Sequence, residues 1–314
     1  MNNTFAKDVV AGLSAKEKHL SSKYFYDDIG SRIFQEIMEM QEYYLTDCEF
    51  EILSLQAKQI IDAVNFKQTF NIVELGAGDG LKTFKLLEFL VHNHIDFHYV
   101  PIDISQGAMD LLTADLKKRL PKLSIHPRVG DYFEVLSKEN VQTNIPSLLL
   151  FLGSNIGNYT EEETLNLLKL FNENMKKGDA LLLGVDLKKN PIIIQNAYLD
   201  KHGITKRFNI NLLKRINREF DGDFKIDDFD FYCHYNPLNG EVRSYIVSLC
   251  NQKVLLKKLN ERFNFAYDEL IWTELSKKYS LDELDHLAEQ SGFRINKHFL
   301  DSKHYFTDSL MIKS

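Results

Sequence analysis

The chain has 314 residues, 44% hydrophobic and 26% charged, and a formal net charge of −7, a globular composition whose acidity argues against binding to nucleic acid or anionic membranes. No apolar run is long enough for a transmembrane helix and the polar N-terminus lacks a signal-peptide core, so we expect no membrane association. Three cysteines without a Cys-x-x-Cys pair favour a cytoplasmic protein without disulfide bonds.

The first sixty residues predict helices separated by aromatic turns. Ser31 can cap a helix in which Ile33 and Ile37 recur at helical spacing. Thr46 can cap a longer helix whose apolar side continues to Ile61. We therefore expect an N-terminal helical segment that contributes residues to a functional site.

Residues 70–83 predict a buried strand, a glycine turn and the start of a helix. Gly76, Gly78 and Gly80 stand at alternate positions, where glycine lets the backbone bend sharply and approach a ligand closely. Leu81 occupies the place of the last glycine of a dinucleotide fingerprint, and no Walker A sequence occurs. The Glu-Leu-Gly-x-Gly-x-Gly form resembles the S-adenosylmethionine (SAM) loop of class I methyltransferases. An ordinary glycine-rich turn is the alternative.

The alternation of strands and helices continues beyond this loop and then stops. Ser105 and Thr160 can each cap a helix. Beyond the fifth strand no βαβ unit occurs for about 80 residues, and Asn239-Gly240 there marks a hairpin. A helix and two strands then follow at the C-terminal end of the sequence. The four strands after the loop are predicted at residues 98–104, 124–129, 147–152 and 180–186.

This pattern predicts an α/β fold: a class I methyltransferase-like doubly wound sheet with a second, smaller α+β substrate-binding domain. We expect no internal repeats. The expected parts are an N-terminal helical segment at residues 1–60, a SAM-binding Rossmann-like domain at 61–187 and 271–314, and an inserted substrate-binding domain at 188–270.

Polar residues follow several of the predicted strands, where ligands lie in doubly wound sheets. Asp103 ends the second strand, about 20 residues beyond the glycines, and is placed to meet ribose hydroxyls. A strand-end or capping role is its alternative. Asp131 and Tyr132 end the third strand, where they suit either an adenine ring or a simple turn. The polar loop 153–159 follows the fourth strand and is placed to hold substrate.

Two further groups of polar residues have simpler interpretations. Glu274 and Ser276 share one face of an extended segment, which on its own favours a solvated sheet edge over an amine site. His92, His94 and His98 lack a carboxylate or cysteine partner at ligand spacing. We therefore expect no metal site.

Motifs in a fixed order give a more specific indication. Together they resemble the SAM-dependent L-histidine Nα-methyltransferases of ergothioneine biosynthesis, which form the betaine hercynine. The resemblance extends from residue 24 to residue 310. Its segments are Tyr24-Phe25-Tyr26-Asp27, Glu42-Tyr43-Tyr44, Glu74-Leu75-Gly76, Tyr99-Val100-Pro101-Ile102-Asp103, Phe151-Leu152-Gly153-Ser154, Gly157-Asn158, Phe208-Asn209, Thr273-Glu274-Leu275-Ser276 and Asp308-Ser309-Leu310.

The resemblance implies SAM as cofactor, a free amino acid as substrate and a role for each matching position. The implied cofactor-binding residues are Tyr26, Gly76, Gly78, Lys82, Asp103, Asp131 and Tyr132. The residues implied to hold the substrate amino and carboxylate groups are Tyr43, Gly153, Asn158 and Tyr198, and those implied to meet the imidazole are Glu274 and Ser276. Tyr43 and Asn158 are expected to orient the reacting amine. We expect the protein to be a monomer.

Two positions depart from the family pattern, and both belong to the expected substrate pocket. Asn155 stands where the histidine enzymes carry Thr, and Ser244 where they carry Met. Methylation of another amino acid or a tryptophan-like aromatic amine is therefore the alternative within the enzyme class. A ligand-binding scaffold without turnover is the alternative outside it.

Overall fold

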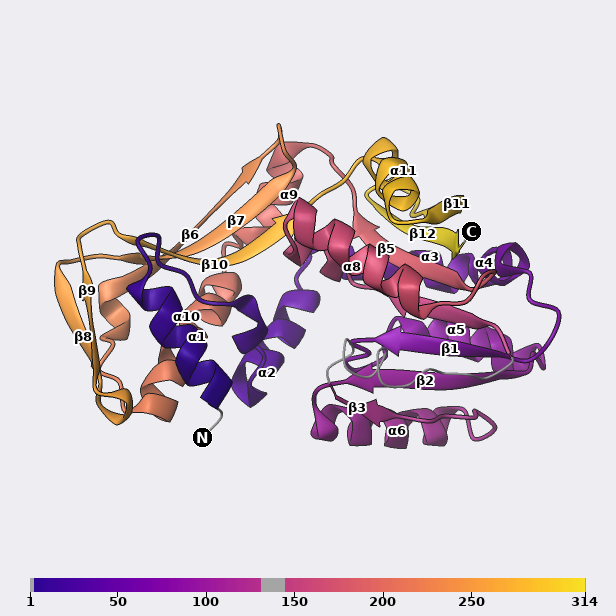
Figure 1. The fold of residues 1–314 in the computed structure, drawn as a ribbon, viewed down its shortest axis with the longest axis horizontal. Helices are drawn as coiled ribbons and strands as arrows, with labels where there is room; N and C mark the ends of the chain where they lie inside the picture. Colours follow the sequence, from indigo (N-terminus) through magenta and orange to yellow (C-terminus); the bar gives the residue numbers. More distant parts are fainter. Residues whose placement is uncertain (1–2, 131–144, 314) are drawn as a thin grey trace. The chain divides into compact units, whose positions relative to one another are not determined.

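The computed structural model describes residues 3–130 and 145–313, drawn in Figure 1. The chain forms two compact units, which we call unit 1 and unit 2. Unit 1 comprises Met1–Tyr44 and Lys189–Lys277, and unit 2 comprises Leu45–Lys188 and Lys278–Ser314.

Unit 2 contains a seven-stranded sheet in the order β11-β12-β5-β4-β1-β2-β3. Strands β1 to β5 are parallel, whereas β12 pairs antiparallel with both β5 and β11. The strand order reverses at β1, between β2 and β4, which is where doubly wound sheets bind ligands. The strands are β1 (Phe70–Leu75), β2 (Phe97–Asp103), β3 (Arg128–Val129), β4 (Ser147–Phe151), β5 (Ala180–Asp186), β11 (Phe293–Leu300) and β12 (Phe306–Lys313).

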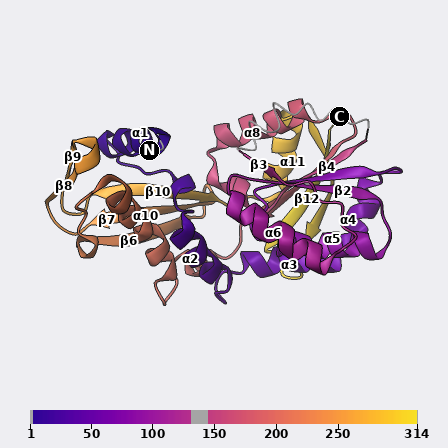
Figure 2. The ribbon, with the colours of Figure 1, turned by 90° about the horizontal axis from the view of Figure 1, so that it is seen from below.

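Helices cover both faces of this sheet (Figure 2). Helix α3 packs against α5 and β12, and α8 packs against α11. The apolar face beneath α8 and α11 is a continuous buried cluster that includes Leu149, Phe151 and Phe171. The helical elements are α3 (Leu45–Leu55), α4 (Ala57–Val64), α5 (Thr83–His92), α6 (Gln106–Arg119), η2 (Asn155–Asn158), α8 (Glu161–Asn174) and α11 (Leu281–Gln290).

Unit 1 is built on a three-stranded antiparallel sheet in the order β10-β7-β6. Its core packs around α10, whose apolar face includes Leu212, Leu213 and Ile216. The strands are β6 (Phe229–Asn236), β7 (Glu241–Ser248) and β10 (Leu270–Lys277), with a separate hairpin of β8 (Gln252–Leu256) and β9 (Glu261–Phe265). The helical elements are α1 (Asn3–Ser14), η1 (Ser22–Tyr24), α2 (Asp28–Met38), α9 (Pro191–Tyr198), α10 (Ile204–Phe220), η3 (Ile226–Asp228) and η4 (Lys257–Leu259).

The units divide after residues 44, 188 and 277, where the sequence predicts boundaries at 60, 187 and 270, so the second boundary agrees within one residue and the other two differ. Helices α3 and α4 belong to unit 2, because α3 packs on β12 and both contact α5. Strand β10 belongs to unit 1, because it completes the sheet by pairing with β7.

Several local expectations are confirmed and others are wrong. Strand β5 has the predicted bounds, and the side chains of Ser105 and Thr160 cap α6 and α8. Ser31 does not cap α2, because the helix already begins at Asp28 and the Asp27 side chain accepts from its first turn. The long helix predicted after Thr46 is two helices that meet at Gln56. The β8–β9 hairpin was not anticipated.

Candidate active site

The glycine turn after β1 adopts a backbone conformation that favours glycine. Gly76, Gly78 and Gly80 have φ angles of 70°, 54° and 66°. A Cβ atom on Gly78 would meet nothing within 4 Å, whereas one on Gly80 would lie 2.4 Å from Leu112 Cδ1. The turn therefore packs tightly against α6 at its end and is open at Gly78, where a ligand can approach.

Asp103 lies beside this open turn. Its carboxylate accepts a hydrogen bond from the N–H of Gly78 at 3.3 Å and from the N–H of Ser105 at 2.9 Å. The carboxylate thus links the end of β2 to the glycine turn and keeps acceptor capacity for a further hydroxyl group.

Glu74 links the elements that carry the glycine turn to one another. Its buried carboxyl group accepts hydrogen bonds from the hydroxyls of Thr83, at the start of α5, and Tyr99, on β2. Burial raises the pKa of Glu74 to about 7. The Glu74 side chain on β1 therefore connects to α5, which follows the glycine turn, and to β2, which pairs with β1.

Lys82 and the loop after β4 meet at the carboxylate of Glu49. The Lys82 ammonium forms an ion pair with Glu49 Oε2, and the N–H of Gly153 donates to Glu49 Oε1 at 2.7 Å. Gly153 has a φ of 77°, and a Cβ atom there would lie 3.3 Å from Lys82 Nζ and 3.6 Å from Asn155 Nδ2. The structure thus brings Lys82, Gly153 and Asn155 together within unit 2.

The short η2 turn carries Asn158 at its end, with its side chain exposed. The turn is fixed by Ser154, whose carbonyl accepts from the N–H of Gly157 at 2.9 Å. The Ser154 hydroxyl accepts from the N–H of Asp186 at 3.0 Å. Asn158 therefore projects from a loop that is anchored to the end of β5.

In unit 1, the residues expected to meet the imidazole lie on one face of the sheet. Ser244 on β7 stands directly opposite both Cys233 on β6 and Glu274 on β10. Tyr198 on α9 contacts Ser276 through their hydroxyls at 2.9 Å. Burial raises the pKa of Cys233 to about 12, and the nearby Glu274 contributes to that rise. The face therefore combines one carboxylate with small hydroxyl and thiol groups.

Five aromatic rings adjoin this face. Tyr43 makes edge contacts with Tyr198 at 6.2 Å and with Phe34 at 6.4 Å between ring centroids. Tyr26 contacts Phe34 at 5.4 Å and Phe208 at 5.6 Å. Tyr26 is partly exposed, and the pKa of its hydroxyl is raised mainly by desolvation and further by the Glu274 carboxylate. The rings thus connect Tyr26 with Tyr198, whose hydroxyl contacts Ser276, within unit 1.

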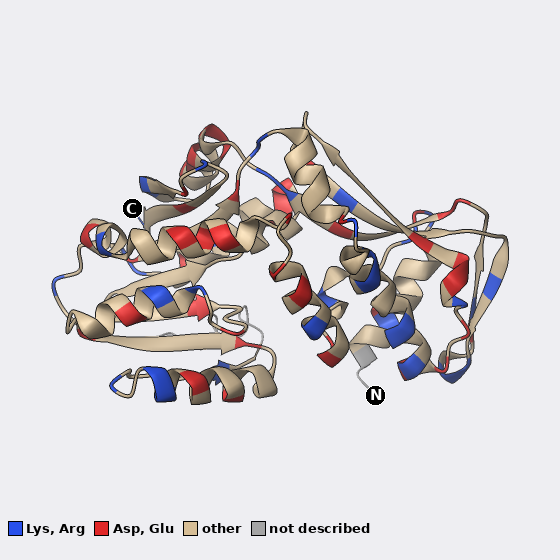
Figure 3. Cartoon of the chain, turned by 180° about the vertical axis from the view of Figure 1, so that it is seen from behind, with Lys and Arg blue, Asp and Glu red and all other residues tan. Residues whose placement is uncertain are grey.

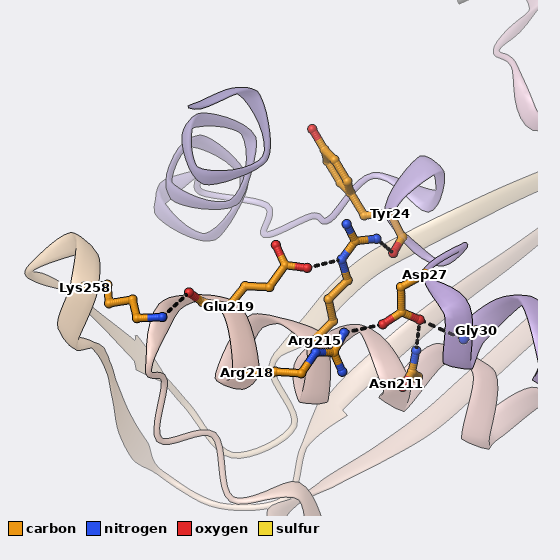
Figure 4. A network of polar contacts seen from close by, with 8 residues as sticks. All are labelled: Tyr24, Asp27, Gly30, Asn211, Arg215, Arg218, Glu219 and Lys258. Carbon is orange, nitrogen blue, oxygen red and sulfur yellow. Dashed lines mark hydrogen bonds and ion pairs between the residues drawn. The ribbon is translucent and has the colours of Figure 1, made fainter. Parts of the chain in front are cut away.

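A polar network fixes the backbone beside Tyr26 (Figure 4). The Asp27 carboxylate accepts from the N–H of Gly30 at 2.7 Å, from Asn211 at 2.9 Å and from Arg218. Burial alone would raise the pKa of Asp27, but these contacts outweigh burial and lower it. The start of α2 is thereby held against α10, and the position of Tyr26 is set.

The structure groups the sequence-predicted residues by unit. The sequence did not identify Phe34, Phe208 or Glu49 as site residues. Phe34 and Phe208 are apolar, and Glu49 lies within a predicted helix, so none of them stood out as a site residue. Asp131 and Tyr132 lie outside the described residues. Unit 1 carries Tyr26, Tyr43, Tyr198, Ser244, Glu274 and Ser276, and unit 2 carries Gly76, Gly78, Lys82, Asp103, Gly153, Asn155 and Asn158.

Comparisons with known proteins identify the family of the chain. Residues 5–313 match the family described as "Histidine-specific methyltransferase, SAM-dependent". The chain is 32% identical over 311 residues to the histidine N-alpha-methyltransferase of Mycolicibacterium smegmatis, covering 98% of this chain and 94% of that protein. It is 27% identical over 312 residues to the L-tryptophan methyltransferase of Psilocybe serbica, covering 90% and 85% respectively. Since the family match spans both units, the chain belongs to the SAM-dependent, histidine-specific methyltransferases.

Proposed function

We propose that this enzyme transfers methyl groups from SAM to the α-amino group of L-histidine, up to the trimethylated betaine hercynine. The observation that carries the substrate assignment is the row of Glu274, Ser244 and Cys233 on one sheet face, with Ser276 and the Tyr198 hydroxyl beside it. A carboxylate accepts from an imidazole N–H and a hydroxyl can donate to the other ring nitrogen. Glu274 and Ser276 are therefore the proposed imidazole partners.

The glycine turn fits SAM. Gly78 leaves open space where a nucleoside can approach, and the Asp103 carboxylate lies beside it as a ribose acceptor. Lys82 supplies a cation for the methionine carboxylate. Tyr26, in unit 1, and Asp131 and Tyr132, in the segment outside the described residues, complete the cofactor-binding set that we propose.

The reaction needs a neutral amine. The α-amino group of a free amino acid is mostly protonated near neutral pH, since even a chain-terminal amino group has a pKa of about 8. The amine must therefore lose a proton before it attacks, although no strong base is needed. When bound, SAM supplies an electrophilic methyl group on a sulfonium. We propose that Asn158 in unit 2 and the Tyr43 hydroxyl in unit 1 accept hydrogen bonds from the amine N–H groups. These hydrogen bonds would orient the lone pair of the amine. Most of the acceleration then comes from proximity and alignment.

The groups proposed to hold the rest of the amino acid are the backbone of Gly153, the Asn155 amide and the Tyr198 hydroxyl. Aromatic faces favour a quaternary ammonium, so the Tyr43 ring is a suitable wall for the methylated product. Figure 3 shows basic and acidic residues interspersed within each unit. None of the helices in the described ranges has the length and hydrophobicity of a membrane span.

A tryptophan-like aromatic amino acid is the second candidate substrate. Ser244 is fully buried directly opposite Glu274, where the histidine enzymes carry the larger Met. A smaller side chain there leaves more room for a larger ring.

The two candidates are separated by incubating the purified protein with SAM and each of the twenty amino acids, and following product masses. A mass increase of one to three methyl groups on histidine supports the proposal. A mass increase on tryptophan alone would mean that tryptophan, rather than histidine, is the substrate. No mass change with any amino acid would reject both.

A further inference from the structure

Glu49 is a fully buried acidic residue on α3, and each of its carboxylate oxygens has its own partner. Oε2 is paired with the Lys82 ammonium at the start of α5, and Oε1 accepts from the N–H of Gly153 in the loop after β4. Burying a charge is costly unless it is paired and hydrogen-bonded. Lys82 supplies the opposite charge and Gly153 supplies the hydrogen bond. Both residues lie in elements that carry the proposed cofactor and substrate residues of unit 2.

The sheet leaves space for this carboxylate at Gly184 on β5. A Cβ atom on Gly184 would lie only 2.1 Å from Glu49 Oε1 and 3.1 Å from Leu152 Cα. The φ angle of Gly184 is outside the left-handed region, so its backbone conformation is open to other residues. Glycine is therefore needed at this position because Oε1 occupies the space where a side chain would begin.

Asp308 lies next to the same carboxylate but has a different environment. It pairs with Gly184 across β12 and β5, and among the described residues neither of its carboxyl oxygens has a hydrogen-bond partner. Burial and the nearby charge of Glu49 raise the pKa of Asp308 well above its ordinary value. Both effects favour the protonated form of Asp308, and Glu49 is the carboxylate that forms the ion pair with Lys82.

We propose that Glu49 is a positioning residue that fixes Lys82 and Gly153 relative to each other. Through Lys82 it orients the methionine carboxylate of SAM, and through Gly153 it orients the substrate amino acid. An ammonium has three donors and Glu49 uses one, so donors remain available for the carboxylate of the cofactor. This inference rests on the proposed roles of Lys82 and Gly153.

Two substitutions separate the two contacts. Glu49→Gln keeps the shape and leaves a carbonyl oxygen for Gly153, but turns an amide NH₂ group toward Lys82. A hydrogen bond to a charged group is lost, so the Kd for S-adenosylhomocysteine should rise about tenfold. The KM for histidine should change by no more than about twofold, because the contact to Gly153 is kept.

Gly184→Ala acts on the other contact without removing any polar group. The new methyl group displaces Oε1, the atom that accepts from Gly153. We expect the KM for histidine to rise about tenfold, with a smaller change in the Kd for S-adenosylhomocysteine. Gly107→Ala is the matched control, because a Cβ atom at Gly107 meets nothing within 4 Å. Asp308→Asn removes no hydrogen bond among the described residues and should likewise leave both constants unchanged.

Calorimetric binding of S-adenosylhomocysteine, steady-state kinetics and thermal denaturation are measured on each variant. A larger change of the Kd in Glu49→Gln, together with a larger change of the KM in Gly184→Ala, supports the positioning role of Glu49. A lowered Tm with unchanged Kd and KM, or equal changes of Kd and KM in both variants, overturns it. Absence of methyl transfer by the unsubstituted enzyme would reject the proposed function instead. The calorimetric comparison still decides the role of Glu49 in that case.

Discussion

Glu74 makes the stability of unit 2 depend on pH in a direction opposite to that of most carboxylates. Its carboxyl group is buried between Thr83 and Tyr99, and burial raises its pKa from 4.5 to about 7. In the unfolded chain the same group ionises near its ordinary value. Between these two values the folded protein therefore binds one more proton than the unfolded chain.

The sign and size of the effect follow from this difference. Stability falls with rising pH wherever the folded state binds more protons, so Glu74 destabilises the fold progressively from about pH 4.5 to about pH 7. One pKa unit is worth about 1.4 kcal/mol, which gives a total loss of about 3 kcal/mol. Above that range the contribution of Glu74 is constant.

Comparison with Glu74→Gln isolates the effect, because glutamine does not titrate. Urea unfolding of both proteins would be followed by circular dichroism at pH 5, 6, 7 and 8. The unfolding free energy of the unsubstituted protein should fall by roughly 2.5 kcal/mol relative to the variant across this series. A difference between the two proteins that stays constant with pH would refute the assignment of a raised pKa to Glu74.

The remaining predictions concern the substrate face and one buried ion pair. Glu274→Ala should raise the KM for histidine about tenfold or more and leave the calorimetric Kd for S-adenosylhomocysteine unchanged, whereas equal loss of both would mean that Glu274 is structural. Tyr198→Phe removes the hydroxyl that contacts Ser276 and should lower the unfolding free energy by about 1 kcal/mol while raising the histidine KM. The Lys278–Asp186 pair is fully buried, so Lys278→Met should cost about 3–5 kcal/mol in urea unfolding, and the double variant with Asp186→Leu should recover part of the loss.

Features encoded within a few residues could be predicted from the sequence. The glycine turn, the cap at Ser105 and strand β5 each depend on neighbours along the chain, and each occurs as expected. The start of α2 shows where this approach fails. Asp27, rather than Ser31, caps that helix, and its carboxylate is also held by Asn211 and Arg218, more than 180 residues away in the sequence. No local pattern contains that information.

The residues missed in the site were missed for the same physical reason. Glu49 is an ordinary helix residue in the sequence, and its role depends on Lys82 and Gly153, which lie 33 and 104 residues away. The pairing of Ser244 with Glu274 depends on the register of β7 and β10, which shifts at a bulge between Trp272 and Glu274. A shift of one residue would turn Glu274 to the opposite face of the sheet.

The charges around Lys82 are arranged to suit a cationic cofactor. SAM carries a sulfonium and an ammonium against one carboxylate, so an isolated lysine beside it would repel the group that reacts. Burial lowers the pKa of Lys82, but the charge and the hydrogen bond of Glu49, with smaller contributions from other acidic groups nearby, together raise it above its ordinary value. The lysine therefore stays protonated within its ion pair with Glu49. Burial and the charge of Glu49 favour the neutral form of the neighbouring Asp308. Lys82 can therefore bind a carboxylate by hydrogen bonding and local electrostatic attraction. It adds little repulsion at the distance of the sulfonium, because the fields of the paired charges of Lys82 and Glu49 largely cancel there.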